Sequence, residues 1–283
     1  MNHDVTGKIA LEVYNEIKQS SKLKILDRDL EEYEEVAYEQ EESKFEEPTD
    51  LRNQNLLQNN WFDVIVKMKR FRNEIEKQRL KRCIMRIAKV LNLKNKLYKR
   101  RKLEFEKDDE TLWENLEIIW AHFFPKKSYQ RFTDDWQLIG FQGSDPYTDL
   151  RASGILFIDN FIHFIKNYPE QSKECLEIAN KEDNFFFFAV VGIHATMWCI
   201  DILNTESFIK FMINECYKYE PIIIYQELFA WTLVQFTYKW DEKQRDIMEF
   251  NIITREFVKS VKTNSDDAKQ FILNQLALRK KKL

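Results

Sequence analysis

The sequence predicts an all-α protein, and three observations support this prediction. Glycine and proline, the residues that most often interrupt helices, number only five each in 283 residues. No sustained stretch alternates apolar and polar residues with the period of two that a half-buried strand requires. Apolar residues instead recur at spacings of three and four, which place them on one face of a helix. A chain of this length can form one sizeable domain with extensions, or two small domains.

Charge, cysteine spacing and the N-terminal sequence disfavour nucleic-acid binding, a disulfide framework and secretion. The 44 basic and 47 acidic residues give a formal net charge of −3, so no global charge favours specific nucleic-acid binding. Cys83, Cys175, Cys199 and Cys216 show no paired spacing, which favours a reducing compartment over a disulfide framework. The first residues lack the pattern of a signal peptide. We therefore expect a cytoplasmic protein.

Residues 1–55 are predicted to form an acidic N-terminal arm with one short helix. Ile9, Val13 and Ile17 give that helix its apolar stripe. The segment from Asp27 to Asp50 contains twelve acidic residues and only two basic ones. Such a block of like charges resists compaction. Two interpretations remain open: a solvated arm, or an intramolecular mask for the basic region that follows.

Residues 56–107 are predicted to form a basic helical extension. From Lys67 to Lys107 there are seventeen lysines and arginines against four glutamates, with a narrow apolar seam that includes Leu80, Ile84 and Ile87. A solvated helix face is the simplest interpretation. An anionic membrane surface is an alternative partner, and the run from Lys99 to Lys102 also resembles a nuclear localisation signal. Few aromatic residues are interleaved, which disfavours nucleic acid.

A globular domain is expected over residues 108–265. Thr111 and Glu114 match a capping box at its first helix, and Pro125 ends that helix. Further helices follow from apolar faces after residue 154, and the run from Phe185 to Leu203, apolar all round, predicts a central buried helix. Two segments, Ile222–Trp240 and Met248–Val261, complete six or seven helices. Residues 266–283 are predicted to form a C-terminal helix and a basic tail.

The stretch from Trp136 to Gly154 stands out because it holds three of the five glycines. Asp145 and Pro146 predict a turn, after which Thr148 and Asp149 are each candidates to cap a helix with a side-chain oxygen. Arg151 then falls in the first turn, where the positive end of the helix dipole does not favour a cation. We expect Arg151 to point outward and to bind an anion, although an arginine in a polar loop is more often part of a surface ion pair.

This stretch resembles the signature of the ELMO (engulfment and cell motility) domain family. The resemblance rests on the order and spacing of a set of residues: Trp136, Gly140, Phe141, Gln142, Asp145, Pro146, Thr148, Asp149, Arg151 and Gly154. It continues through the segment from Phe187 to Thr196 and through an aromatic region from Tyr225 to Phe250. The resemblance implies a multi-helix domain of the ELMO type, here preceded by a long charged helical extension.

The resemblance also implies a function. In the branch of the family that acts on Arf-like small GTPases, the arginine at the position of Arg151 is implied to stimulate GTP hydrolysis. The implied partner is an Arf-family GTPase in its GTP-bound form, to which the chain supplies an arginine finger without an active site of its own. Gln142, Asp145, Thr148 and Asp149 are then expected to shape the presentation of Arg151. Trp136, Gly140, Phe141, Pro146 and Gly154 are expected to be structural.

Two residues depart from the family pattern, and one of them, Ala152, together with the helical extension motivates a second hypothesis. Leu150 stands where an aromatic residue is usual, and Ala152 where glycine is usual, so its methyl restricts the approach of a partner's phosphate loop. The alternative is a non-catalytic scaffold or adaptor in a cytoskeletal or ciliary assembly, which would also set its location.

Other site chemistries find little support in the sequence. No phosphate-binding loop of the Gly-x-x-x-x-Gly-Lys-Ser/Thr type occurs. His194 and Cys199 fall on different helix faces, which disfavours a catalytic pair. Asp159 and His163 share a helix face, but no third ligand is in register, so a structural pair is favoured over a metal site. We expect no metal and no cofactor.

Overall fold

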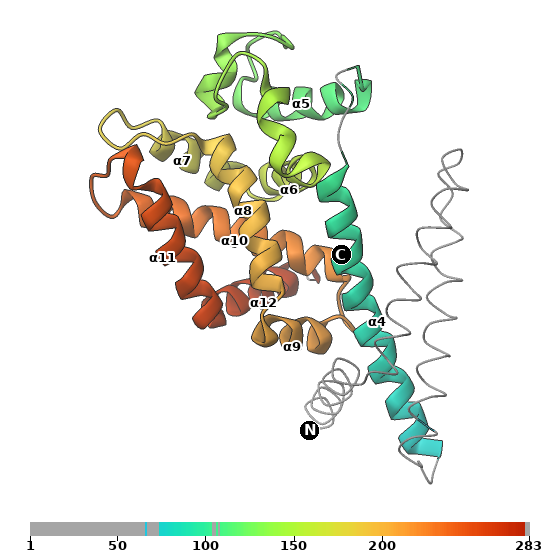
Figure 1. The fold of residues 1–283 in the computed structure, drawn as a ribbon. Coiled ribbons are helices and arrows are strands. Elements are labelled where there is room, and N and C mark those ends of the chain that lie inside the picture. Colours follow the sequence, from blue (N-terminus) through green and yellow to red (C-terminus); the bar gives the residue numbers. More distant parts are fainter. Residues whose placement is uncertain (1–65, 67–73, 104–105, 107, 281–283) are drawn as a thin grey trace. The chain divides into compact units, whose positions relative to one another are not determined.

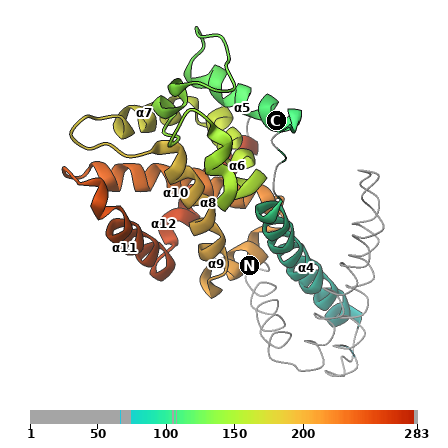
Figure 2. The same ribbon diagram turned by 45° about the horizontal axis from the view of Figure 1, so that its top comes forward.

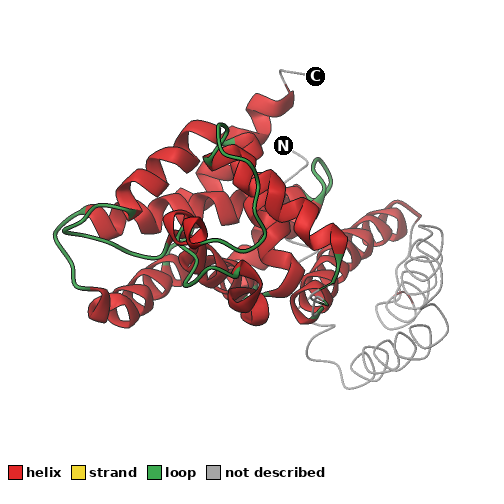
Figure 3. Cartoon of the chain, turned by 90° about the horizontal axis from the view of Figure 1, so that it is seen from above, coloured by secondary structure: helices red, strands yellow, loops and turns green. Residues whose placement is uncertain are grey.

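The computed structural model describes residues 66, 74–103, 106 and 108–280, to which the following account is confined. These residues form α-helices and short 3-10 helices joined by loops, with no strand among them (Figures 1 and 3). The all-α prediction is confirmed. The predicted acidic arm, the first part of the basic extension and residues 281–283 of the tail lie outside the described residues.

The chain divides into two compact units. Among the described residues, one unit contains residues 66, 74–92 and 210–218, and the other contains residues 93–103, 106, 108–209 and 219–280. The helices α4 (Glu74–Lys102) and α9 (Glu206–Glu215) contribute residues to both units. In the first unit, Leu80, Ile84 and Ile87 of the predicted apolar seam are buried. The guanidinium of Arg86 lies 4.6 Å from the centre of the Tyr217 ring.

The second unit holds the motif and most of the helices. Its α-helices are α5 (Glu110–Phe123), α6 (Gly154–Asn167), α7 (Pro169–Ala179), α8 (Phe188–Leu203), α10 (Pro221–Asp241), α11 (Phe250–Thr263) and α12 (Asp266–Lys280). Three 3-10 helices accompany them: η1 (Asp134–Ile139), η2 (Pro146–Ala152) and η3 (Ile247–Glu249). Helix α10 packs against α6, α7, α8 and α12, and Figures 1 and 2 show it among these helices.

The core of this unit is built on α6 and α8, its two most apolar helices. Most of α8 is buried, as its uniformly apolar sequence predicts. Gly192 allows α6 and α8 to approach closely, because a Cβ at this position would lie 2.7 Å from the ring of Phe157. No single described helix is long and apolar enough to cross a membrane; α8 and α9 reach such a length only as a bent pair.

Several local predictions are corrected by the structure. The predicted capping box at Thr111 does not form, because Asp109 is the N-cap and its side chain accepts a hydrogen bond from the Thr111 N–H at 2.9 Å. Helix α5 therefore begins at Glu110. Asp109 lies two residues before Thr111 and competes successfully for the same free backbone N–H groups.

Helix α7 and the short 3-10 helices η1 and η2 were not predicted from the sequence.

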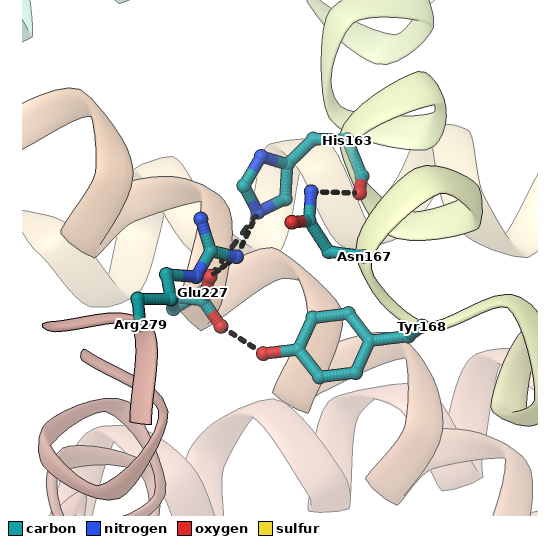
Figure 4. Close-up of polar contacts among 5 residues, drawn as sticks. All are labelled: His163, Asn167, Tyr168, Glu227 and Arg279. Atoms are coloured by element: carbon teal, nitrogen blue, oxygen red, sulfur yellow. Dashed lines mark hydrogen bonds and ion pairs between the residues drawn. The ribbon is translucent and has the colours of Figure 1, made fainter. Parts of the chain in front are cut away.

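A buried carboxylate joins three helices of the second unit. Glu227 of α10 has no exposed surface, and its side chain contacts His163 of α6, Tyr168 and Arg279 of α12 (Figure 4). Oε1 of Glu227 lies 3.2 Å from Nε2 of His163 and also pairs with the Arg279 guanidinium, while the Tyr168 hydroxyl donates to Oε2. Burial, with the charge of Glu227, raises the pKa of Tyr168 well above its ordinary value. A buried charge requires such partners to be tolerated.

Removing the cation from this cluster is expected to destabilise the fold. Arg279→Gln takes away the positive partner of a carboxylate that stays buried, so we expect the free energy of unfolding to fall by about 2 kcal/mol. Lys280→Gln is the matched control, since Lys280 carries the same charge in the same turn and lies over the Tyr219 ring at 4.8 Å. Chemical denaturation measures both. Equal loss in the two variants would contradict the role of the buried pair.

Candidate functional site

The first residue of the motif, Trp136, is a buried anchor. Trp136 in η1 has no exposed surface, and its indole N–H donates to the carbonyls of Gln130 and Arg131, both at 3.2 Å. Its ring packs edge-on against Trp120 and Phe141, with ring centres 5.0 and 5.4 Å apart. These contacts hold the incoming chain of the motif against α5.

Gly140 packs its backbone directly against the start of α8. Its φ of 91° lies in the left-handed region, where residues with a side chain are strained. A Cβ here would lie 2.1 Å from the backbone nitrogen of Phe188. The carbonyl of Gly140 accepts a hydrogen bond from the Val190 N–H at 3.2 Å, which satisfies one of the free donors in the first turn of α8. Glycine is needed here for both conformation and space.

The loop that follows is organised by two aspartates. Asp145 is the N-cap of η2 and accepts from the Tyr147 N–H at 3.2 Å, while the Thr148 hydroxyl donates to the Asp145 carbonyl at 2.9 Å. Oδ2 of Asp149 accepts from the Gln142 N–H at 2.7 Å, across the loop. The side chain of Gln142 is exposed. All four predicted presenting residues therefore take part in the local hydrogen bonds that fix the shape of this loop, Gln142 through its backbone N–H and the others also through their side chains.

The predicted capping roles of Thr148 and Asp149 are wrong. Both residues lie within η2, and α6 begins only at Gly154, after an N-cap, Ser153, that makes no side-chain capping bond. Asp145 caps instead because it immediately precedes Pro146, whose fixed φ suits the first helical position. Asp149 makes no hydrogen bond with Arg151; its carboxylate accepts from the Gln142 N–H.

The titration of Asp149 gives a prediction about stability. Burial raises the pKa of Asp149 above its ordinary value of 3.8; the charge of Asp145 adds to this shift and the Gln142 N–H opposes it. A raised folded-state pKa means that the folded chain binds the proton more tightly than the unfolded chain. The contribution of Asp149 to stability is therefore present at low pH and is lost as the pH rises through the folded pKa.

Asp149→Asn tests this, because the amide oxygen of asparagine can still accept from the Gln142 N–H. We expect the unfolding free energy of wild type relative to this variant to fall as the pH rises from about 4 toward 7. Denaturant unfolding at each pH measures it, with Asp183→Asn, at an exposed turn residue, correcting for the loss of one negative charge. A relative stability that rises with pH would contradict the assignment.

Arg151 lies in the last turn of η2, three residues before α6, and not in the first turn of a helix as predicted. A cation is favoured at the carboxyl end of a helix, so the local dipole does not oppose its charge. Its side chain is exposed and makes no hydrogen bond or ion pair with another described residue. The neighbouring Leu150 is buried and Ala152 is exposed. The guanidinium is therefore available to a partner.

The last turn of α4 lies beside this arginine. Gly154 has a φ of 52°, and a Cβ there would lie 2.5 Å from the Leu103 carbonyl and 2.9 Å from that of Arg101. Arg100 pairs with Asp159 of α6 through two hydrogen bonds, of 2.5 and 2.9 Å. The predicted structural pair of Asp159 and His163 does not form. Asp159 pairs with Arg100 of α4, and His163 contacts Glu227 of α10.

A cavity of about 440 Å³ opens between these elements. It is lined by Tyr98, Arg101, Lys102, Leu103, Tyr147, Leu150, Arg151, Ala152 and Gly154. The basic run from Lys99 to Lys102 was predicted to belong to a separate extension. Two of its residues, Arg101 and Lys102, instead line the same cavity as Arg151. The predicted division at residues 107 and 108 remains a prediction, but the compact unit that holds the motif begins at Leu93.

Comparison with known proteins identifies related chains. A sequence model described as the ELMO/CED-12 family matches residues 95–254. ELMO domain-containing protein B of Dictyostelium discoideum is 30% identical over 183 residues, which cover 64% of this chain and 63% of that protein. ELMO domain-containing protein 2 of Bos taurus is 29% identical over 189 residues, covering 65% and 63%.

A third relative, ELMO domain-containing protein 1 of Homo sapiens, is 25% identical over 227 residues, covering 70% of this chain and 68% of that protein. The chain thus matches less than two thirds of the length of the first two relatives, 63% in each case. No solved structure shows a significant match to the chain.

Proposed function

Since the chain belongs to the ELMO/CED-12 family, we propose that it accelerates GTP hydrolysis by an Arf-family small GTPase, with Arg151 as an arginine finger. One observation carries the proposal: Arg151 is exposed and unpaired among the described residues, on a backbone that its neighbours fix in place. An arginine that stabilised the loop through an ion pair or hydrogen bond would have a carboxylate or carbonyl partner, and Arg151 has none among the described residues.

The chemistry suits a guanidinium. In the transition state of phosphoryl transfer, negative charge spreads over the oxygens of the γ-phosphoryl group. A planar, permanently charged guanidinium can donate to two of these oxygens at once and neutralise that charge. The GTPase supplies the nucleotide, Mg²⁺ and the attacking water in this proposal. Arg151 of this chain supplies the charge that the partner's site lacks.

The fixed backbone of the loop supports such a role. Binding an arginine into a partner's site costs less free energy when the backbone that carries it is already ordered. The hydrogen bonds from Gln142 to Asp149 and from Tyr147 to Asp145 provide this order without using the guanidinium. Only the side chain of Arg151 then has to be immobilised when the partner binds.

Single-turnover GTP hydrolysis by a panel of GTP-loaded Arf and Arf-like proteins tests the proposal. With the chain added, at least one member is expected to hydrolyse its GTP faster by about 10³-fold or more. Small GTPases from outside the Arf family are the control for specificity. If no Arf-family protein is accelerated, the proposed activity is wrong.

Ala152 favours a second candidate function, a non-catalytic scaffold. Its methyl group is exposed beside Arg151, at the surface that a phosphate loop would approach. The nucleotide dependence of binding separates the two functions. A GTPase activator binds its partner best with GTP or with GDP and aluminium fluoride, which mimics the transition state, whereas a scaffold stays bound whichever nucleotide is present.

A further inference from the structure

The cavity beside Arg151 has an uneven charge. Arg101, Lys102 and Arg151 all line it, and its described lining residues include no aspartate or glutamate. Cations that converge on a hollow without carboxylates create a local positive potential, which attracts anions more strongly than the same charges spread over a convex surface. This feature is separate from the net charge of −3 for the whole chain.

Two of the three cations have no hydrogen-bond or ion-pair partner among the residues that the structure describes. Neither Arg101 nor Arg151 makes a hydrogen bond or ion pair with another described residue, although Arg101 is half-buried. The adjacent Arg100 provides the contrast, because it forms two hydrogen bonds with Asp159. A half-buried guanidinium with unused donors gains more from an anionic ligand than one that is already paired.

Lys102 adds to the positive field at the same place. Its ammonium lies 4.3 Å from the centre of the Tyr98 ring. A hydrogen bond with Lys102, together with the charge of Lys102, lowers the pKa of Tyr98. Both effects are those of a cation held next to a phenol, and both residues line the cavity.

The fold holds the two cationic segments together. Gly154 permits the last turn of α4 to approach the start of α6 closely, since any larger residue would overlap the Leu103 and Arg101 carbonyls. The bidentate pair between Arg100 and Asp159 fastens the same two helices. The backbone that carries Arg101 and Lys102 is thereby placed beside Arg151 before any ligand binds, which lowers the entropic cost of binding.

We propose that this cavity binds a small molecule that carries two or more phosphate groups on a compact carbon skeleton. The guanidiniums of Arg101 and Arg151 and the ammonium of Lys102 would receive the phosphates, since planar guanidiniums match phosphate oxygens in pairs. Tyr147, Leu150 and Leu103 supply walls for the skeleton. A volume of about 440 Å³ is in the range of small-molecule sites. Soluble polyol phosphates and the headgroups of phosphorylated inositol lipids share this chemistry.

The ligand has a consequence that rests on the proposed function. A phosphate that pairs with Arg151 occupies the guanidinium intended for the γ-phosphoryl group. The ligand and the GTPase then compete, so a bound ligand switches off GTPase activation. Binding of the ligand by itself does not depend on that activity.

Isothermal titration calorimetry with inositol trisphosphate tests the site on the full chain. We expect saturable binding that is weakened about tenfold or more for each cation removed, by Arg151→Ala or by the double variant Arg101→Gln/Lys102→Gln. The matched control is Lys96→Gln/Lys99→Gln, which removes the same charge from exposed positions of the same helix outside the cavity. The control is expected to bind like wild type. Thermal unfolding of each variant verifies that it is folded.

A second arm distinguishes the sources of the phosphates. Vesicles containing phosphatidylinositol bisphosphate are compared with phosphatidylserine vesicles of equal surface charge. Selective binding to the former that Arg101→Gln/Lys102→Gln removes assigns the site to a lipid headgroup, and binding of inositol trisphosphate alone assigns it to a soluble ligand. Absence of saturable binding to both probes overturns the proposal, and so does equal weakening in the control variant.

The two proposals fail in different ways. If no GTPase is accelerated but inositol trisphosphate binds and the cavity variants lose it, the phosphate site stands and the proposed function falls. If GTPases are accelerated and neither probe binds, the reverse holds.

Discussion

Arg151→Ala is expected to reduce the stimulated rate of GTP hydrolysis by about 10³- to 10⁵-fold, which corresponds to about 4–7 kcal/mol of transition-state stabilisation. The loss falls on the rate of hydrolysis and not on folding. Arg151 makes no hydrogen bond or ion pair with another described residue, so its removal leaves no buried group unsatisfied. We expect the unfolding free energy to change by less than about 0.5 kcal/mol.

Single-turnover assays at saturating concentrations of the variant measure this effect. Arg151→Lys retains the charge but not the planar fork, and should recover only a small part of the rate. Arg255→Ala, which removes an exposed arginine from α11, is the matched control and should behave like wild type. Acceleration by Arg151→Ala equal to that by wild type would remove Arg151 from the mechanism.

Gly140→Ala is expected to lower the unfolding free energy by about 3–5 kcal/mol. Two costs combine at this position. A residue with a side chain is strained at a φ of 91°. The added Cβ would also lie 2.1 Å from the nitrogen of Phe188 and 2.8 Å from that of Ala189, both backbone atoms of α8 that cannot move aside independently.

Gly143→Ala is the control for the same loop. A Cβ at Gly143 would meet no atom within 4 Å, so this variant should be neutral or slightly more stable, because alanine restricts the unfolded chain. Chemical denaturation of the two variants measures the difference. Similar stabilities would show that the contact between the motif and the start of α8 does not constrain the fold.

Helix positions followed largely from the sequence, while the choice of helix caps did not. Apolar spacing placed α8 and α10 close to their observed bounds, since a helix needs a continuous apolar surface to be buried. Asp109 and Asp145 cap α5 and η2, where the sequence analysis selected Thr111 and Thr148 or Asp149. Several oxygen-bearing residues were available at each start, and the path of the backbone before the helix decided between them.

The candidate site was predictable in part. The motif from Trp136 to Gly154 marked Arg151 as the residue of interest, and the structure places its side chain in solvent. The loop contacts around it differ from expectation, because Asp149 bonds to Gln142 across the loop instead of capping a helix. Such a contact depends on the bend of the chain over residues 142–144, which residue spacing alone does not specify.

Periodicity and the punctuation of the chain by glycine and proline determined that this protein is helical, and a short glycine-containing motif determined its family. Only the tertiary structure brought Arg101 and Lys102 to the cavity beside Arg151, and buried Glu227 between His163, Tyr168 and Arg279. The physical reason is one of range. Helix formation depends on residues three and four positions apart, whereas the meeting of α4 with α6 depends on close packing at Gly154 and on an ion pair between residues 59 positions apart.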